Sequence, residues 1–212
     1  MDYKNCVIFL NGDPPRKKVV KKYVKKSSFV LCSDGGANYT SKYNLTPNVI
    51  IGDMDSIDKQ VLKKFKKKNV EIVKIDEQET TDFEKSLNYC VQNNFNSVFV
   101  FGGASPRADH TLNNYSIMKR YYKKLNIVLL DNNFEISFIN KHISFNYKKG
   151  KLVSLLPMAR ATGVTTRGLE FPLKGETLEL GVREGTLNRS TAQNVSISLK
   201  TGNLILFKKH FI

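Results

Sequence analysis

Two carboxylates separated by one residue follow a short apolar run. Val49 to Ile51 is apolar, Gly52 interrupts the run, and Asp53 and Asp55 come next. In extended chain, side chains at positions i and i+2 leave the same face of a strand, about 6.5 to 7 Å apart. Both carboxylates could therefore bind one Mg²⁺ or a pair of metal ions. The alternative is a turn in which the aspartate and serine side chains bond nearby backbone.

A second acidic group occurs between Asp76 and Glu84, where five carboxylates gather in an otherwise basic chain. They would repel one another unless they were spread in solvent or neutralised by a cation. Thr81 and Glu84 have the spacing of a capping box, and Asp82 would be stabilised by a helix dipole. The segment therefore predicts a helix start, and a metal-binding role for Asp82 stays open beside that structural one.

Asp34, Gly35 and Gly36 directly follow the apolar run from Phe29 to Ser33. Paired glycines would let backbone N–H groups approach a phosphate or a ribose closely. A tight connection between a strand and a helix, with no ligand, explains the same residues equally well. We keep both interpretations at this point.

Another glycine pair, Gly102 and Gly103, ends a later apolar run, and Arg107 and Asp109 follow it. A guanidinium group can donate two parallel hydrogen bonds to phosphate oxygens, so this loop could form a phosphate clamp. The neighbouring His110 is more typical of a capping or packing residue beside a helix start than of a catalyst.

These residues share a position at the carboxyl ends of predicted strands. Strands and helices alternate over roughly the first 140 residues, which predicts a mainly parallel sheet with helices on both faces. Ligands of such sheets bind beyond the carboxyl ends of the strands, so one crevice could collect the candidate residues. The predicted strands are Asn5–Leu10, Phe29–Ser33, Val49–Ile51, Glu71–Ile75, Ser97–Phe101, Asn126–Leu130 and Glu135–Ile139, and the helices are Arg16–Lys26, Lys59–Lys68, one starting at Thr81 and one near Thr111–Lys124.

The pattern changes after about Lys141, where short β-like runs alternate with glycine and proline turns and no helical stripe continues. This pattern is typical of a smaller antiparallel, sandwich-like β domain. We expect an α/β domain over residues 1–142 and a β domain over residues 143–212, joined by a short linker near Asn140 to Lys149. The predicted strands are Leu152–Leu156, Gly163–Thr166, Leu178–Leu180, Ser196–Leu199 and Leu204–Phe207.

The composition fits a globular protein, with 212 residues, 41% of them hydrophobic. No apolar run is long enough to span a membrane and the first residues lack a secretory pattern, so we expect a cytoplasmic location. The formal charge of +15 favours nucleic acid as a partner, but solvated helix faces explain the lysine runs equally well. Three widely spaced cysteines, Cys6, Cys32 and Cys90, argue against disulfides or zinc and indicate buried thiols.

The chain carries none of the common nucleotide motifs, neither a P-loop nor G-x-G-x-x-G nor a protein-kinase signature. It nevertheless resembles the thiamine pyrophosphokinases, with matching motifs in the same order over almost its full length. The matching segments are SDGGAN at Ser33–Asn38, PNVIIGDMDSI at Pro47–Ile57, EQETTDFEKSL at Glu77–Leu87, the GG and DHTLNN elements between Gly102 and Asn114, then SLLP, GVTTRGLEFPL and the GTLN turn at Gly185–Asn188.

The resemblance implies transfer of a diphosphate from ATP to the hydroxyl of thiamine, with Mg²⁺ as cofactor and AMP as the second product. It also implies a nucleotide site in the α/β domain, a β domain that helps to hold thiamine, and a homodimer. We expect no nucleic-acid or membrane partner. The implied metal ligands are Asp53, Asp55 and Asp82, with Asp55 and Asp82 as catalytic residues; the residues expected to contact ATP or AMP are Asp34, Gly35, Gly36, Gln78, Thr81, Gly102, Gly103, Arg107 and Asp109, and those expected to contact thiamine are Thr186 and Asn188.

The chain departs from the family pattern at several positions. Ser105-Pro106 stands where relatives commonly have glycine, and Ala108 where they commonly have phenylalanine. The thiamine turn reads Thr186-Leu187-Asn188 and lacks a serine, and the chain contains no tryptophan. Two other readings stay open: a pyrophosphokinase for another alcohol, such as a hydroxymethyl pterin, and a basic nucleic-acid binder whose acidic loops only cap helices.

Overall fold

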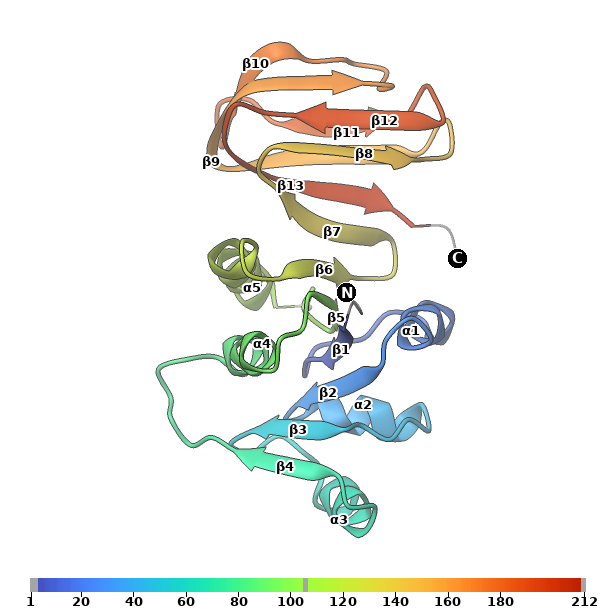
Figure 1. Ribbon diagram of the computed structural model, residues 1–212, viewed down its shortest axis with the longest axis vertical. Helices are drawn as coiled ribbons and strands as arrows, with labels where there is room; N and C mark the ends of the chain where they lie inside the picture. The colour runs from blue at the N-terminus through green and yellow to red at the C-terminus, as the bar shows by residue number, and fades with distance from the viewer. Residues whose placement is uncertain (1–3, 105–106, 211–212) are drawn as a thin grey trace. The chain divides into compact units, whose positions relative to one another are not determined.

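A computed structural model describes residues 4–104 and 107–210 of the chain. The chain divides into two compact units between Asn132 and Asn133. Each unit has its own buried apolar cluster. The predicted fold class is confirmed, since a parallel sheet with helices precedes an antiparallel β region (Figure 1).

The first unit contains a parallel sheet whose strands lie in the order β4-β3-β2-β1-β5-β6. The central strands are almost entirely buried, as expected for strands that are covered on both faces. All predicted strands of this unit form, with ends that agree to within one residue. Their bounds are β1 Asn5–Phe9, β2 Phe29–Ser33, β3 Val49–Gly52, β4 Glu71–Lys74, β5 Ser97–Phe101 and β6 Asn126–Leu130.

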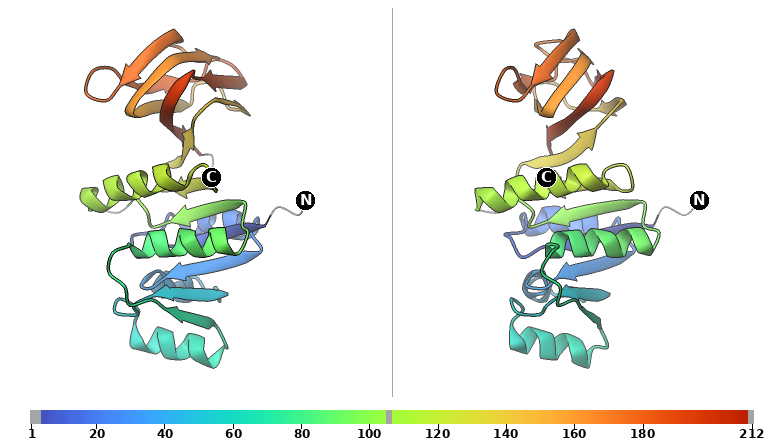
Figure 2. Two further views of the ribbon diagram at one scale, coloured as in Figure 1. Left: turned by 60° about the vertical axis from the view of Figure 1, so that its left-hand side comes forward. Right: turned by 90° about the vertical axis from the view of Figure 1, so that its left-hand side faces the viewer.

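Helices cover both faces of this sheet. The helices α1 (Lys17–Val24), α2 (Gly36–Lys42) and α3 (Lys59–Lys67) lie on one face, where their apolar residues join one cluster with β1 and β2. The helices α4 (Asp82–Gln92) and α5 (Ala108–Tyr121) lie side by side on the other face (Figure 2). The loops that precede α4 and α5 therefore open onto the same edge of the sheet.

The strand order reverses beside β1, and this reversal determines where a ligand can enter. From β1 the chain adds β2, β3 and β4 on one side, then returns to add β5 and β6 on the other side. The loops after β1 and β5 therefore separate and leave a crevice at their carboxyl ends, which is where open parallel sheets bind ligands.

The second unit is antiparallel and is built around the long strand β9. β9 pairs with β11 near its start, with β13 from Val153 to Thr162, and with β10 and β12 toward its end. Inward-facing apolar side chains from these strands form one buried cluster. The strand bounds are β7 Phe134–Ile139, β8 His142–Asn146, β9 Leu152–Arg167, β10 Lys174–Glu179, β11 Gly185–Arg189, β12 Asn194–Ser198 and β13 Thr201–Lys209.

Several sequence predictions need correction. The boundary lies ten residues before the one predicted after residue 142, because β7 pairs along its whole length with β13. The proposed linker at Asn140–Lys149 contains strand β8, which pairs with β12. The two strands predicted within Leu152–Thr166 are one continuous strand, and α5 starts three residues before Thr111. Ser105 and Pro106, where the chain departs from the family pattern, lie outside the described residues.

Two simpler expectations can be compared directly with the structure. Cys6, Cys32 and Cys90 are free and buried, as predicted, and burial raises the pKa of the Cys32 thiol to about 12. Among the helices that the structure describes, none is long and apolar enough to cross a membrane.

Candidate active site

The end of β3 brings two other segments close to the acidic loop. Gly52 has a φ of +145°, a conformation that side chains rarely adopt. A Cβ atom at this position would lie 2.9 Å from Asp34 Cβ and 3.3 Å from Asp82 Oδ1. The missing side chain therefore makes room for the carboxyl groups of Asp34 and Asp82 to approach the strand end.

The Asp34 carboxyl group is buried beneath the loop that follows β3. Its Oδ2 accepts a hydrogen bond from Ser56 N at 2.9 Å, and its Oδ1 accepts one from Ile57 N at 3.0 Å. Burial raises the pKa of Asp34 to about 6; the hydrogen bond from Ser56 opposes this increase, while the nearby Asp55 and Asp82 carboxyls add to it. Asp34 thus shapes the acidic loop, in addition to the ligand contact predicted from sequence.

Three carboxylates meet at this place. Asp34, Asp53 and Asp55 each offer an oxygen, and these oxygens all lie within 4.8 Å of one another. Asp53 Oδ2 also accepts a hydrogen bond from Gln78 Nε2 at 3.3 Å, and this contact is the main reason that its pKa is lowered. Closely spaced carboxylate oxygens are the ligands that Mg²⁺ prefers, so this group of residues fits a small divalent cation.

The first turn of α4 supplies Asp82. Thr81 caps the helix, as predicted, by accepting a hydrogen bond from Glu84 N at 3.3 Å. Burial raises the pKa of Asp82; the nearby Lys85 ammonium lowers it, and the Asp53 and Asp55 carboxyls raise it further. Lys85 Nζ lies 3.8 Å from Asp82 Oδ1. Asp82 is therefore adjacent to the three-carboxylate group, although its oxygens are not among those within 4.8 Å.

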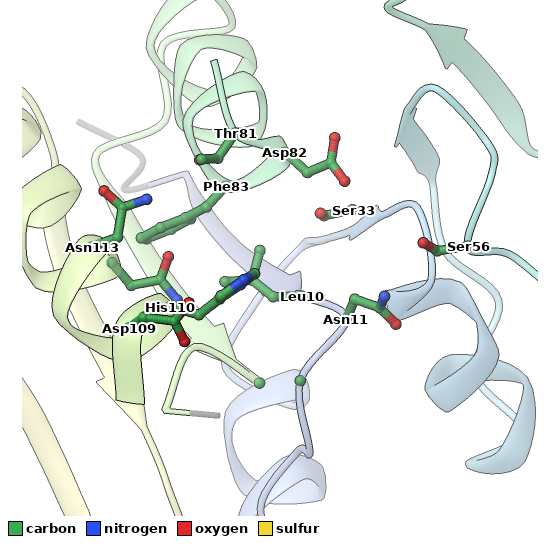
Figure 3. A pocket seen from close by; sticks show the side chains of 13 residues that line it. Leu10, Asn11, Ser33, Ser56, Thr81, Asp82, Phe83, Asp109, His110 and Asn113 are labelled. Atoms are coloured by element: carbon green, nitrogen blue, oxygen red, sulfur yellow. The ribbon is translucent and has the colours of Figure 1, made fainter. Parts of the chain in front are cut away.

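Two cavities adjoin at Thr81 and Asp82. The smaller, of about 310 Å³, is also lined by Asp53, Asp55 and Gln78. The larger, of about 660 Å³, lies at the crevice beside β1 and β5, within the size range of small-molecule sites. In Figure 3, side chains from α5 face those from the end of β2 and from the loops after β1 and β3 across it. Its lining residues are Leu10, Asn11, Gly12, Ser33, Ser56, Thr81, Asp82, Phe83, Gly102, Asp109, His110, Asn113 and Asn114.

The Gly35-Gly36 pair is explained by packing. A Cβ atom on Gly36 would lie 2.0 Å from the Phe9 carbonyl oxygen, and one on Gly35 would lie 2.1 Å from Asn11 Oδ1. The start of α2 therefore packs directly against the end of β1. This geometry favours the tight connection, one of the two interpretations of the glycine pair, and leaves the predicted ligand contact untested.

Arg107 and Asp109 lie together at the start of α5. Arg107 Nη2 is 2.6 Å from Asp109 Oδ2, and this exposed ion pair lowers the pKa of Asp109 to about 2. Asp109 and Gly102 line the larger cavity, whereas the Gly103 carbonyl accepts a hydrogen bond from Asn114 Nδ2 at 2.8 Å, and a Cβ atom on Gly103 would meet Leu129 of β6. The Arg107 guanidinium, which the sequence predicted to bind a phosphate, is therefore paired with a carboxylate of its own chain.

Thr186 and Asn188 belong to β11 in the second unit. Thr186 is exposed, but Asn188 is buried. The Asn188 amide accepts from Phe171 N at 3.1 Å and donates to Phe171 O at 2.7 Å. Its amide group thus holds the segment before β10, which is a structural role that the sequence did not reveal.

Sequence reasoning missed several residues of the first unit. Asn11, Ser56 and Asn113 line the larger cavity, and Lys85 lines the smaller one. A signal for Lys85 was present, because it stands one helical turn after Asp82 and on the same side of α4. The amide residues carried no comparable signal, since asparagine is abundant throughout the chain.

Comparisons with known proteins agree over both units. The family model "Thiamin pyrophosphokinase, catalytic domain" matches residues 20–129, and "Thiamin pyrophosphokinase, vitamin B1 binding domain" matches residues 140–204. Thiamin pyrophosphokinase 1 of Caenorhabditis elegans is 26% identical over 216 residues, covering 94% of this chain and 86% of that protein. Thiamine pyrophosphokinase 1 of rice is 28% identical, covering 79% of this chain and 74% of that protein.

Solved structures share the fold. The thiamine pyrophosphokinase of Bacillus subtilis superposes with a TM-score of 0.87 at 21% identity, covering 99% of this chain and all of that one. The yeast enzyme gives a TM-score of 0.87 at 20% identity, covering 100% of this chain and 87% of that one. Together with the two family models, which span most of both units, these matches show that the chain belongs to the thiamin pyrophosphokinase family.

Proposed function

We propose that this protein transfers the terminal diphosphate of ATP to the hydroxyl of thiamine, giving thiamine diphosphate and AMP in a reaction that depends on Mg²⁺. The family supports the reaction. The observation that carries the proposed site is the group of carboxylates at the end of β3 beside a cavity of about 660 Å³. Oxygens of Asp34, Asp53 and Asp55 would hold the metal ion, with Asp82 next to them.

The chemistry requires positioning and charge neutralisation more than covalent help from the protein. Mg²⁺, when bound, would neutralise charge on the phosphate oxygens. Gln78 holds Asp53 through its amide, and Asp34 holds the loop that carries Asp55. The protein therefore contributes a carboxylate group whose members are already fixed by hydrogen bonds.

Asp82 is the carboxylate that we assign to the thiamine hydroxyl. It lines both cavities, so it lies between the group of carboxylates and the larger space. In this position it can accept a hydrogen bond from the acceptor hydroxyl and direct the oxygen toward the phosphorus. Asp55 remains the second proposed catalytic residue, acting with Asp53 at the phosphates.

The larger cavity is the proposed place of the nucleotide. Gly102 and Asp109 line it together with Asn11 and Asn113, whose amides can donate and accept hydrogen bonds. Arg107 would bind a phosphate after exchanging its contact with Asp109. We further propose that the second unit contributes contacts to thiamine near Thr186 and that the protein is a homodimer, which sedimentation equilibrium can test.

One assay tests the reaction. The purified protein is incubated with ATP and thiamine, and the nucleotide and thiamine products are separated by chromatography. We expect AMP and thiamine diphosphate in equal amounts, and no product when EDTA replaces Mg²⁺. Release of ADP, or AMP release that ignores thiamine, would contradict the proposal, and a hydroxymethyl pterin in place of thiamine tests the rival acceptor.

A further inference from the structure

Lys85 is a lysine that the sequence did not single out and that the structure buries. It lies in the first turn of α4 and is only 5% exposed. Lysine is rarely buried unless its ammonium group is paired and hydrogen-bonded, because removing the charge from water is costly. The partners of this ammonium group therefore indicate what it does.

Those partners come from two different segments. Lys85 Nζ donates to Ile75 O at 3.2 Å and to Glu77 O at 2.7 Å, both in the segment that connects β4 with α4. It also lies 3.8 Å from Asp82 Oδ1 on its own helix. With three N–H donors, one ammonium group can serve all three oxygens. Lys85 thus fastens the connecting segment to the start of α4.

The fastened segment carries Gln78, which follows Glu77 directly. Gln78 Nε2 donates to Asp53 Oδ2 at 3.3 Å and to Asp76 O at 3.4 Å. The position of Gln78 therefore depends on the backbone that Lys85 holds. Lys85, Gln78, Asp53 and Asp82 all line the same cavity of about 310 Å³.

We propose that Lys85 is a positioning residue of this site: its buried ammonium group fixes Gln78 and Asp82 against Asp53, so that a divalent cation and the phosphates meet a preformed set of oxygens. The proposal rests on the function proposed above. It differs from a role in folding alone, in which Lys85 would stabilise the connecting segment without affecting the carboxylates.

The test compares Lys85→Met and Lys85→Arg with Lys74→Met. Lys74 is the last residue of β4, directly before the same segment, and forms an exposed ion pair with Asp76 at 2.8 Å, so it is the matched control. Mn²⁺ alone serves as the probe, and its binding to each folded variant is measured by electron paramagnetic resonance. Thermal unfolding gives the folded fraction, and AMP release with ATP and thiamine gives kcat and KM.

We expect Lys85→Met to bind Mn²⁺ about 10- to 100-fold more weakly and to lose a similar factor in kcat, as is usual for residues that orient metal ligands. Lys85→Arg should recover part of both losses, since it keeps a cation that can donate to the carbonyls. Lys74→Met should stay within about twofold of the wild type, because exposed ion pairs contribute little.

Wild-type Mn²⁺ affinity per folded molecule in Lys85→Met would overturn the proposal. Failure of both Lys85 variants to fold, while Lys74→Met folds, would overturn it as well, because Lys85 would then be a residue of the fold. If the wild-type protein releases no AMP with thiamine, the proposed function fails instead, and Mn²⁺ binding still decides the role of Lys85.

Discussion

The carboxyl groups at the end of β3 differ in acidity because their surroundings differ. Asp34 is buried, and burial raises its pKa to about 6. Asp53 is only half-buried, and the hydrogen bond from Gln78 lowers its pKa. Two neighbouring carboxyls with different pKa values can have different roles: Asp34 holds the loop, while Asp53 remains ionised at any pH near neutrality.

The raised pKa of Asp34 can be measured in the metal-free protein from the ¹³Cγ chemical shift. We expect a value near 6 that decreases when Mg²⁺ is added, because a nearby cation favours the ionised carboxylate. Since the folded pKa exceeds the unfolded one, the folded state binds this proton more tightly. The contribution of Asp34 to stability is therefore full below about pH 4 and is lost as the pH rises through about 6. A pKa that does not respond to Mg²⁺ would place the cation elsewhere.

Substituting the proposed catalytic carboxylates should separate activity from stability. Asp55→Asn and Asp82→Asn should each lower kcat by about 100-fold or more, because each substitution removes a negative charge that the proposed site uses beside the metal ion and the phosphates. Their far-ultraviolet circular dichroism should match that of the wild type. Asp58→Asn is the control: Asp58 caps α3 by accepting from Gln60 N at 2.7 Å, and asparagine caps equally well. Mg²⁺-dependent rates equal to the wild type in both variants would defeat the assignment.

At the scale of elements, α2 connects the packing of the sheet with the shape of the acidic loop. Its N-terminus packs against Phe9, and its Asn38 binds the loop, donating to Ser56 O at 3.2 Å and accepting from Asp58 N at 3.0 Å. A displacement of α2 should therefore move the carboxylates, even though no residue of the helix is a proposed metal ligand.

Gly36→Ala tests this connection. The added methyl group would meet the Phe9 carbonyl, so we expect a loss of about 1–3 kcal/mol in the free energy of unfolding, together with weaker Mn²⁺ binding. Gly150→Asn is the control, because Gly150 has a φ of +79° in open space and asparagine tolerates that conformation. Urea unfolding measures the free energy of unfolding of both variants. Unchanged stability in Gly36→Ala would show that α2 can shift freely away from β1.

The elements that the sequence predicted well are those whose apolar pattern is strong. The strand Ser97–Phe101 matches β5 at both ends, because a largely buried parallel strand is an almost uninterrupted apolar run. β8 was missed because exposed residues alternate with half-buried ones along it, and β11 was missed because it is mostly exposed; such short segments resemble loops. The start of α5 was placed too late, since its N-cap is Arg107, which is not a usual capping residue and makes no side-chain cap.

For the site, the sequence identified the carboxylates but not the groups that hold them. Asp53, Asp55 and Asp82 stand out as acidic residues after apolar runs in a basic chain. The burial of Asp34 and Lys85 depends on contacts between segments distant in sequence, such as Asp34 with Ile57. Local patterns cannot predict such contacts, so the roles of these two residues required the fold.

At the scale of the whole molecule, the chain carries many lysines that no step of the proposed chemistry uses. The formal net charge is +15, and nine of the 34 lysine and arginine residues are lysines of α1 and α3. MgATP is an anion, so a general positive potential could increase its rate of encounter. At physiological ionic strength, however, exposed charges act over only about 8 Å. The lysines should therefore affect catalysis little. A nucleic-acid binder, in contrast, would depend on them for its affinity.

Replacing four exposed lysines of α3 distinguishes these possibilities. In the variant with Lys59, Lys63, Lys66 and Lys67 changed to glutamine, helix propensity is retained while four positive charges are removed. We expect kcat/KM for thiamine and MgATP to stay within about twofold at 0.15 M salt, while affinity for a random RNA falls and depends less steeply on salt. A decrease in kcat/KM of about tenfold or more would mean that α3 guides the nucleotide to the crevice. Tight RNA binding by the wild type that survives Asp55→Asn but is lost with these four lysines would instead favour the nucleic-acid reading, because a basic binder gains its affinity from counterion release by its lysines.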